Sequence, residues 1–179
     1  MLDSMNDAAA SLPVVIVGGG FSGAMLAVRL AELGQASVLI ERGEQVGLGV
    51  AYSTPLDDHR LNVRAERMSA RPDRPADFTD WLALHAPAFA DPEGFAPRRL
   101  YGLYVQARLA EVEAARPGLI RRIRGEAARI EGETVILADG ARIPGRAVVL
   151  ATGNPPPRPA VAGEGPRRID DPWRPDALA

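Results

Sequence analysis

Three glycines near the N-terminus, Gly18, Gly20 and Gly23, have the spacing G-x-G-x-x-G. The pattern is weak by itself, but a β-branched run, residues 13–17, precedes it and a helical pattern follows it. The next apolar run ends in Glu41, which lies 18 residues after Gly23. This order of strand, glycine turn, helix and strand is typical of a dinucleotide-binding βαβ unit. A structural glycine turn without a ligand is the alternative.

Each residue of this unit has a physical task. Gly18 permits the tight turn out of the strand, and Gly20 lets the backbone approach a pyrophosphate because it has no Cβ. Gly23 lets the helix pack closely on the sheet. The pyrophosphate would then lie at the positive end of the helix dipole. The Glu41 carboxylate would accept both ribose hydroxyls and repel a 2′-phosphate, which disfavours NADP at this position.

The same turn serves FAD and NAD, and three features favour FAD. A loop-rich insertion, residues 42–99, follows the second strand, where a plain NAD domain would continue with short alternating units. Short runs joined by glycine turns predict an antiparallel meander before the last strand. That strand ends in Thr152-Gly153, which lets the backbone approach a cofactor. An NAD-dependent dehydrogenase and a non-catalytic module that binds FAD or another adenine dinucleotide remain alternatives.

The elements that position the turn predict an α/β fold with a Rossmann-like parallel sheet and a small antiparallel β-meander on one side. The expected strands are residues 13–17, 37–41, 119–123 and 147–151, and the expected helices are residues 22–33, 75–85 and 100–115. Asp77 is the expected cap of the middle helix.

Three segments are expected along the chain. Residues 1–12 form a flexible tail, and residues 13–155 form the cofactor-binding domain. Residues 156–179 form a Pro-rich linker toward a second nucleotide-binding domain.

The composition excludes several classes of function. The chain has no cysteine and no lysine, and its two histidines leave little scope for a metal site, so we expect no metal, thiol or P-loop chemistry. A net charge of −2 and 5% aromatic residues argue against nucleic-acid and membrane partners. The N-terminal residues carry no targeting pattern, so the cytoplasm is the expected location.

Several polar residues of the insertion have less specific readings. Asp57 and Asp58 indicate a turn, and we expect His59 to be an exposed loop residue. Four arginines could bind a phosphate or form a solvated face: Arg64, Arg67, Arg71 and Arg74.

Five motifs carry a resemblance to a known group: residues 15–23 (Val-Ile-Val-Gly-Gly-Gly-Phe-Ser-Gly), Gly49-Val-Ala-Tyr52, Leu61-Asn-Val63 with Met68-Ser69, Leu100-Tyr-Gly102 with Tyr104, and Ala151-Thr-Gly-Asn-Pro155. On these motifs the chain resembles the N-terminal FAD-binding portion of flavoproteins with two dinucleotide-binding domains, the glutathione-reductase-like and flavin monooxygenase superfamily. It resembles more narrowly the bacterial FAD/NAD(P)-binding oxidoreductases.

The resemblance implies further contacts with FAD. Phe21 and Ser22 would belong to the phosphate turn, and Arg42 would lie beside the adenosine ribose or the pyrophosphate. Residues Gly49 to Tyr52 would run near the flavin, and the backbone of Ala127 would read the adenine. The remaining expected contacts are Thr152 and Gly153 with the pyrophosphate, and Asn62, Met68 and Ser69 with the isoalloxazine region.

The resemblance also implies an activity. Flavin would take hydride from NAD(P)H and reduce or oxygenate a small-molecule substrate, whose identity the sequence does not give. No residue is assigned as a catalytic acid or base. Members of the group are longer and carry a second nucleotide-binding domain, whereas this chain ends soon after Trp173. We therefore expect either a fragment or a short homologue that depends on a partner chain.

Overall fold

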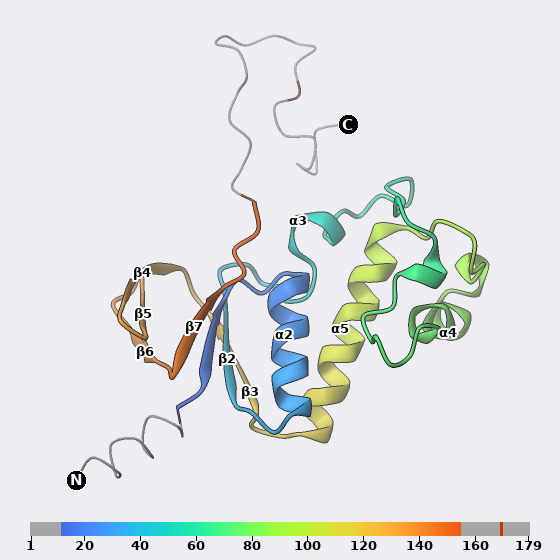
Figure 1. Ribbon diagram of the computed structural model, residues 1–179. Coiled ribbons are helices and arrows are strands. Elements are labelled where there is room, and N and C mark those ends of the chain that lie inside the picture. The colour runs from blue at the N-terminus through green and yellow to red at the C-terminus, as the bar shows by residue number, and fades with distance from the viewer. Residues whose placement is uncertain (1–11, 155–168, 170–179) are drawn as a thin grey trace.

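The computed structural model describes residues 12–154 and Ile169, which form an α/β fold with two β-sheets (Figure 1). The larger sheet has four parallel strands in the order β3-β2-β1-β7. Its strands are β1 Val14–Val17, β2 Ser37–Glu41, β3 Ile120–Arg124 and β7 Ala147–Leu150. All four strands predicted from the sequence are therefore confirmed, each within one residue at either end.

The central strand of this sheet is buried on both faces. Val14 and Ile16 belong to the core beneath the helices, whereas Val15 and Val17 belong to a second core on the opposite face. A strand buried on both faces needs apolar residues at consecutive positions instead of an alternating pattern. This explains the continuous β-branched run before the glycine turn.

The second core lies under the smaller, antiparallel sheet, which has the order β4-β5-β6. Its strands are β4 Ala127–Glu131, β5 Thr134–Leu137 and β6 Arg142–Pro144. Val135, Leu137 and Ile143 project from it into the core that also holds Val15 and Ile40. The predicted meander and its position on one side of the parallel sheet are thus confirmed.

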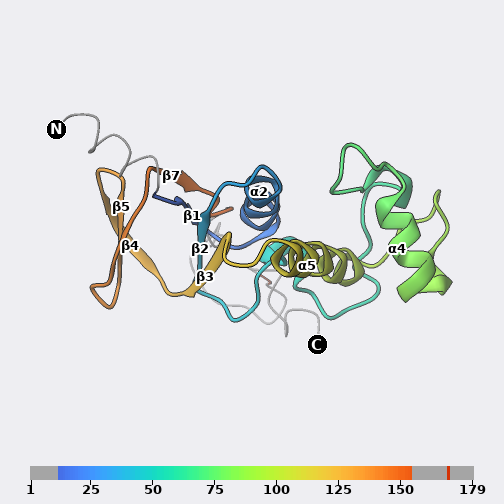
Figure 2. The ribbon, with the colours of Figure 1, turned by 90° about the horizontal axis from the view of Figure 1, so that it is seen from below.

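The helices cover the other face of the parallel sheet. Figure 2 shows α2 next to the sheet, α5 alongside α2, and α4 farthest from the sheet. Their bounds are α2 Phe21–Glu32, α4 Asp77–His85 and α5 Arg98–Ala115, with a short helix α3 Gly49–Tyr52 and 3₁₀ turns η1 Ala65–Arg67 and η2 Pro87–Phe89. The helix α2 ends where Gly34 takes a positive φ of 74° and closes a Schellman-type turn.

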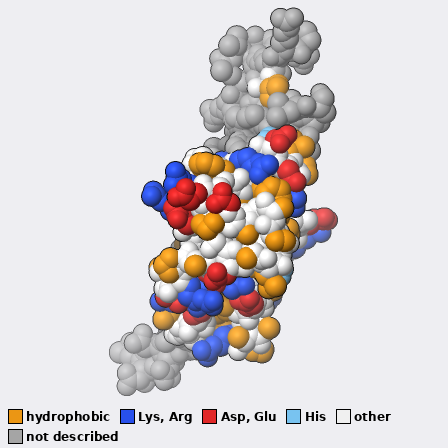
Figure 3. All heavy atoms as spheres, turned by 90° about the vertical axis from the view of Figure 1, so that its right-hand side faces the viewer, with side chains coloured by type: hydrophobic (Ala, Val, Ile, Leu, Met, Phe, Trp, Pro, Cys, Tyr) orange, Lys and Arg blue, Asp and Glu red, His pale blue; other side chains and the backbone are white. Residues whose placement is uncertain are grey.

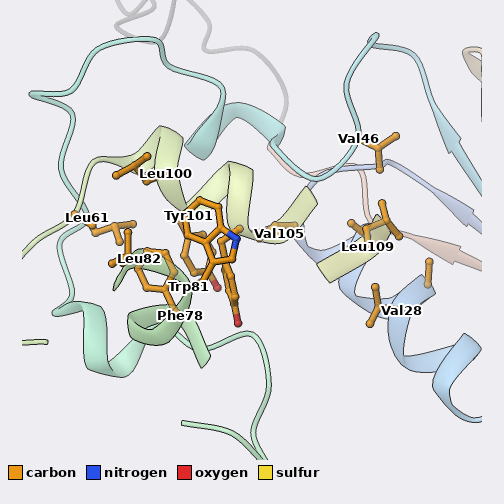
Figure 4. Packing of buried hydrophobic residues seen from close by; sticks show 14 of the residues in the cluster. Val28, Val46, Leu61, Phe78, Trp81, Leu82, Leu100, Tyr101, Val105 and Leu109 are labelled. Atoms are coloured by element: carbon orange, nitrogen blue, oxygen red, sulfur yellow. The ribbon is translucent and has the colours of Figure 1, made fainter. Parts of the chain in front are cut away.

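An aromatic core attaches the insertion to α5. Phe78 and Trp81 of α4 pack against Tyr101 and Tyr104 of α5, with ring centroids 5.0–6.0 Å apart across the two helices. Figure 4 shows Phe78, Trp81 and Tyr101 gathered in this core. The predicted capping role of Asp77 is wrong. Helix α4 begins after Ala76 without a side-chain cap, and the buried Asp77 carboxylate instead accepts a hydrogen bond from the Tyr104 hydroxyl at 2.8 Å. Tyr104 comes from a distant segment, so local pattern does not reveal this pairing.

The face of the molecule on the α4 side carries basic, acidic and apolar side chains mixed together (Figure 3). The four arginines of the insertion each lie within 4.0 Å of a carboxylate, in the pairs Arg64–Glu93, Arg67–Glu66, Arg71–Asp73 and Arg74–Asp77. This pairing favours the solvated-face interpretation of these arginines. Among residues 12–154, no helix is both long enough and apolar enough to cross a membrane.

Candidate functional site

The glycine turn connects β1 to α2 at the carboxyl edge of the parallel sheet. Gly18 has a φ of +105°, and a Cβ on it would lie 2.3 Å from the carbonyl oxygen of Ala151. The N–H of Ala151 donates to the carbonyl of Val17 at 2.7 Å. The end of β7 therefore lies directly against the turn, with Thr152 beside Gly18 and Gly153 following. The structure brings these predicted site residues together.

The other two motif glycines differ in what surrounds them. A Cβ on Gly23 would lie 1.9 Å from the carbonyl oxygen of Gly18, so the start of α2 has no room for a side chain there. A Cβ on Gly20 would meet only Gly49, with its Cα at 3.4 Å, which is ordinary van der Waals contact. Gly20 also has an extended backbone, φ −67° and ψ −167°, that other residues adopt. The packing of the protein therefore requires glycine at position 23. At position 20 it leaves open space where a Cβ would lie, and we call this space beside Gly20 the cradle.

The cradle faces the N-terminal end of α2. Gly20 is the N-cap and supplies no side-chain cap, and the first turn of the helix contains no acidic residue. The first N–H groups of a helix have no partner within the helix and carry partial positive charge. This end of α2 is therefore suited to bind an anion, with Phe21 half-buried and Ser22 exposed beside it.

The carboxylate of Glu41 is fixed beside the turn by two backbone donors. Its Oε2 accepts the N–H of Gly19 at 2.6 Å, and its Oε1 accepts the N–H of Gly43 at 2.8 Å. A carboxylate offers about four lone-pair positions, so both oxygens can still accept a ribose hydroxyl. The next residue, Arg42, is exposed. The structure thus positions and orients the predicted ribose acceptor.

Ala127 lies close to the same end of β2. The N–H of Gly125 donates to the carbonyl of Glu41 at 2.9 Å, and β4 begins two residues later at Ala127. The segment from Gly125 to Ala127 therefore passes next to Glu41.

A loop after β2 faces the turn, and it was not fully identified from the sequence. The N–H of Gly47 donates to the carbonyl of Gly19 at 2.7 Å, and Gly49 lies against Gly20. In α3, the Tyr52 ring contacts the ring of Phe21, with centroids 6.2 Å apart, and burial raises the pKa of Tyr52. The segment from Gly47 to Gly49 therefore forms a second side of the site. Its signal in the sequence is the pair of glycines at 47 and 49, of which the prediction includes only Gly49.

Asn62, Met68 and Ser69 are placed elsewhere in the insertion. Asn62 is exposed, and Met68 packs on the core. The Ser69 hydroxyl donates to the carbonyl of Arg74 at 2.7 Å and accepts the N–H of Arg71 at 3.0 Å. No hydrogen bond within residues 12–154 joins any of these three to the glycine turn, so their predicted contact with the isoalloxazine remains a prediction.

Asp57 and His59 each have a protein partner, which lies in α5 for Asp57 and within its own loop for His59. Arg99 forms an ion pair with Asp57, and its hydrogen bond lowers the pKa of that carboxyl. His59 Nδ1 lies 2.6 Å from the Thr54 hydroxyl. Within the described part of the chain, no group of three or more His, Cys, Asp or Glu residues could hold a metal ion.

The parallel sheet, the glycine turn and the anchored carboxylate define a dinucleotide-binding domain of the Rossmann type. Residues 15–155 match the protein family described as FAD-NAD(P)-binding, and the chain belongs to this family. No curated protein matches the chain.

Solved structures share the fold. A structure of OTEMO in complex with FAD and NADP is 25% identical, with a TM-score of 0.57, and the match covers 85% of this chain and 28% of that one. An FAD-bound form of OTEMO is 26% identical, with a TM-score of 0.55 over 85% of this chain and 27% of that one. The bacillithiol disulfide reductase Bdr from Staphylococcus aureus, 17% identical, shares the fold with a TM-score of 0.56 over 79% of this chain and 38% of that one. The chain thus spans well under half of each of these proteins.

Proposed function

We propose that this chain is the FAD-binding module of a flavin-dependent oxidoreductase. The observation that carries the proposal is the open cradle at Gly20, which lies between an uncapped helix end and the anchored Glu41 carboxylate. A pyrophosphate fits the first feature because it is an anion, and a ribose fits the second because its two hydroxyls can donate to a carboxylate. The residues present therefore fit a dinucleotide.

The two halves of this dinucleotide and its pyrophosphate would contact different residues. The adenosine half would lie over Glu41 and Ala127, and Arg42 would flank it. The pyrophosphate would lie between the α2 end and the small residues Thr152 and Gly153. The other half would continue along the facing segment from Gly49 to Tyr52.

Three observations support FAD over NAD as this dinucleotide. The antiparallel sheet and the long insertion are the features that favoured FAD from the sequence, and both are present in the fold. The family description names both FAD and NAD(P) and does not distinguish between them. The two matched structures at 25% and 26% identity are described as binding FAD, one of them with NADP as well.

When bound, FAD would supply the redox chemistry by accepting hydride from NAD(P)H for transfer to a substrate or to oxygen. The chain's own residues would bind and orient the FAD. Glu41 holds the ribose and rejects a 2′-phosphate, the end of α2 neutralises the pyrophosphate charge, and Gly20 leaves the space that the phosphates need. No acid or base is assigned to the chain, and NAD(P)H and the substrate would be bound by other parts of the complete system.

The test is the identity of the bound nucleotide. We expect the purified chain to absorb near 450 nm, or to gain this absorbance after incubation with FAD and removal of excess, and titration calorimetry to show tighter binding of FAD than of NAD. A colourless chain that cannot be reconstituted with FAD but binds NAD would overturn the proposal in favour of a dehydrogenase-type domain. NADH oxidation by the FAD-loaded chain, with and without candidate partner domains, then separates an oxidoreductase module from a non-catalytic FAD-binding one.

A further inference from the structure

The loop that faces the phosphate turn is held from behind by one side chain of α5. We define the facing loop as residues 46–49. The amide Nε2 of Gln106 donates to the carbonyl oxygen of Val46 at 2.9 Å. The Val46 side chain is buried and belongs to the same apolar core cluster as Leu109, which lies one turn further along α5 than Gln106 (Figure 4). The loop is therefore attached to α5 by a hydrogen bond and by apolar packing at the same residue.

The opposite side of the facing loop touches the phosphate turn. Gly47, the residue after Val46, donates its N–H to the carbonyl of Gly19 at 2.7 Å, and Gly49 lies against Gly20. Because Val46 and Gly47 share a peptide unit, the carbonyl held by Gln106 and the N–H that binds Gly19 belong to one rigid plane. The orientation of that plane is thus fixed from both ends.

The backbone is adapted to this attachment. Gly47 has a φ of +97°, and a Cβ on it would lie 3.1 Å from Cγ of Gln106 and 3.2 Å from a methyl of Val105. A Cβ on Gly102, one turn earlier in α5, would lie 2.6 Å from a methyl of Leu48. Two glycines thus let the loop and the helix approach closely enough for the Gln106 amide to reach the Val46 carbonyl.

We infer that Gln106 is a positioning residue for the dinucleotide: it fixes the peptide between Val46 and Gly47 and so sets the separation of Gly49 from Gly20. The inference rests on the proposed function, because this separation borders the cradle assigned to the pyrophosphate. A loop fixed before binding retains a ligand better than a loop that must be ordered on binding. Gln106 touches the loop and not the ligand, so its effect on the dinucleotide is indirect.

The experiment compares Gln106→Met and Gln106→Glu with the wild type and with Gln35→Met. Methionine keeps the length and the helix propensity but cannot donate, and an ionised glutamate cannot donate either. Gln35 is the matched control because its amide oxygen accepts a hydrogen bond from Arg146 at 2.8 Å, just before β2 begins and at the opposite edge of the sheet from the turn. Two quantities are measured: the FAD dissociation rate, and the exchange rate of the Gly47 amide proton in the ligand-free chain.

We expect both Gln106 variants to release FAD about fivefold to tenfold faster, the scale of one lost hydrogen bond. We also expect faster exchange of the Gly47 amide proton in both Gln106 variants. Gln35→Met should leave both rates unchanged. The melting temperatures of all three variants should stay within a few degrees of the wild type. Unchanged FAD release, or unchanged Gly47 exchange, in both Gln106 variants would overturn the inference. If the wild type binds no FAD, the proposed function fails on its own, and Gly47 exchange alone then decides the role of Gln106.

Discussion

A Cβ on Gly23 would lie 1.9 Å from the carbonyl oxygen of Gly18, so these two residues of the turn must approach without a side chain between them. At Gly20, the middle glycine of the motif, a Cβ would meet only the Cα of Gly49 at 3.4 Å. The same motif therefore contains one glycine required for the protein's own packing and one whose empty space is available to a ligand.

This difference predicts that the two glycines fail differently when substituted. Gly20→Val should leave the fold intact and abolish FAD binding, because the branched side chain would occupy the cradle. Gly23→Ala should destabilise the chain by about 1–3 kcal/mol or more, because the clash is with backbone that has no alternative position. Urea denaturation and FAD titration of both variants separate the two effects. If FAD affinity of Gly20→Val stays within about threefold of the wild type, the phosphate turn is misplaced.

Glu41 has two hydrogen bonds in the ligand-free chain, and the ribose would add two more. Glu41→Ala should weaken FAD binding by about 1.5–3 kcal/mol, the scale of hydrogen bonds to a charged group. Glu41→Gln should also weaken it, because an amide presents an NH₂ group to one of the donors Gly19 and Gly43. Calorimetric titration with FAD measures both. Glu32→Ala is the control, because Glu32 is the last residue of α2 and its carboxylate pairs with Arg29. Equal losses in all three variants would argue against a specific ribose contact by Glu41.

Much of this architecture could be predicted from the sequence, because it depends on local patterns. The strand before Gly18 and the strand ending in Glu41 follow from consecutive apolar residues, and the meander follows from glycine turns between short runs. The positions of the turn and of Glu41, the proposed ribose acceptor, follow from the glycine spacing together with the flanking patterns, since 18 residues after Gly23 the chain has just completed a helix and a strand.

The parts that could not be predicted depend on contacts between distant segments. Asp77 before an apolar helix is indistinguishable in sequence from a helix cap, and only the fold brings Tyr104 to it, 27 residues later. Gln106 lies 60 residues from the carbonyl it holds. A half-buried glutamine in the middle of a helix carries no local signal for such a role.

The buried tyrosines lead us to expect that the chain loses folding stability at alkaline pH. Burial raises the pKa of Tyr104 to about 12, with a further contribution from the hydrogen bond to Asp77, and burial also raises the pKa values of Tyr101 and Tyr52. In the unfolded chain a tyrosine titrates at about 10. The folded chain therefore binds these protons more tightly, and the resulting stability is complete below pH 10 and is lost as the pH rises from about 10 toward 12.

Absorbance at 295 nm and circular dichroism over the same alkaline titration test this expectation. The chain has three tyrosines, so the full phenolate signal is readily calibrated. We expect little phenolate at pH 10 while the fold persists, followed by phenolate formation together with loss of the folded signal. Substantial phenolate at pH 10 with unchanged circular dichroism would show that the tyrosine hydroxyls are not protected as described.

The pair of Tyr104 and Asp77 should stabilise the attachment of α4 to α5. The hydroxyl donates to a carboxylate whose side chain is only 3% exposed, and it accepts the N–H of Ala70 at 3.0 Å. Tyr104→Phe removes the donor from Asp77 and the acceptor from Ala70, which should cost about 1–3 kcal/mol of unfolding free energy. Arg108, 3.4 Å from Asp77, and Arg74, 3.7 Å from it, would remain as partners of the carboxylate.

A double-mutant cycle with Tyr104→Phe and Asp77→Asn isolates this pair from the surrounding packing. Because the two groups are in direct contact, we expect a coupling energy of about 0.5–3 kcal/mol in urea denaturation. Additive effects of the two substitutions would mean that the hydrogen bond between Tyr104 and Asp77 contributes nothing to the free energy of unfolding. The FAD affinity of Tyr104→Phe should remain within about threefold of the wild type, since the hydroxyl binds Asp77 and Ala70 of the insertion while Glu41 and the glycine turn stay unchanged. A larger loss of affinity would instead mean that the order of the insertion itself controls cofactor binding.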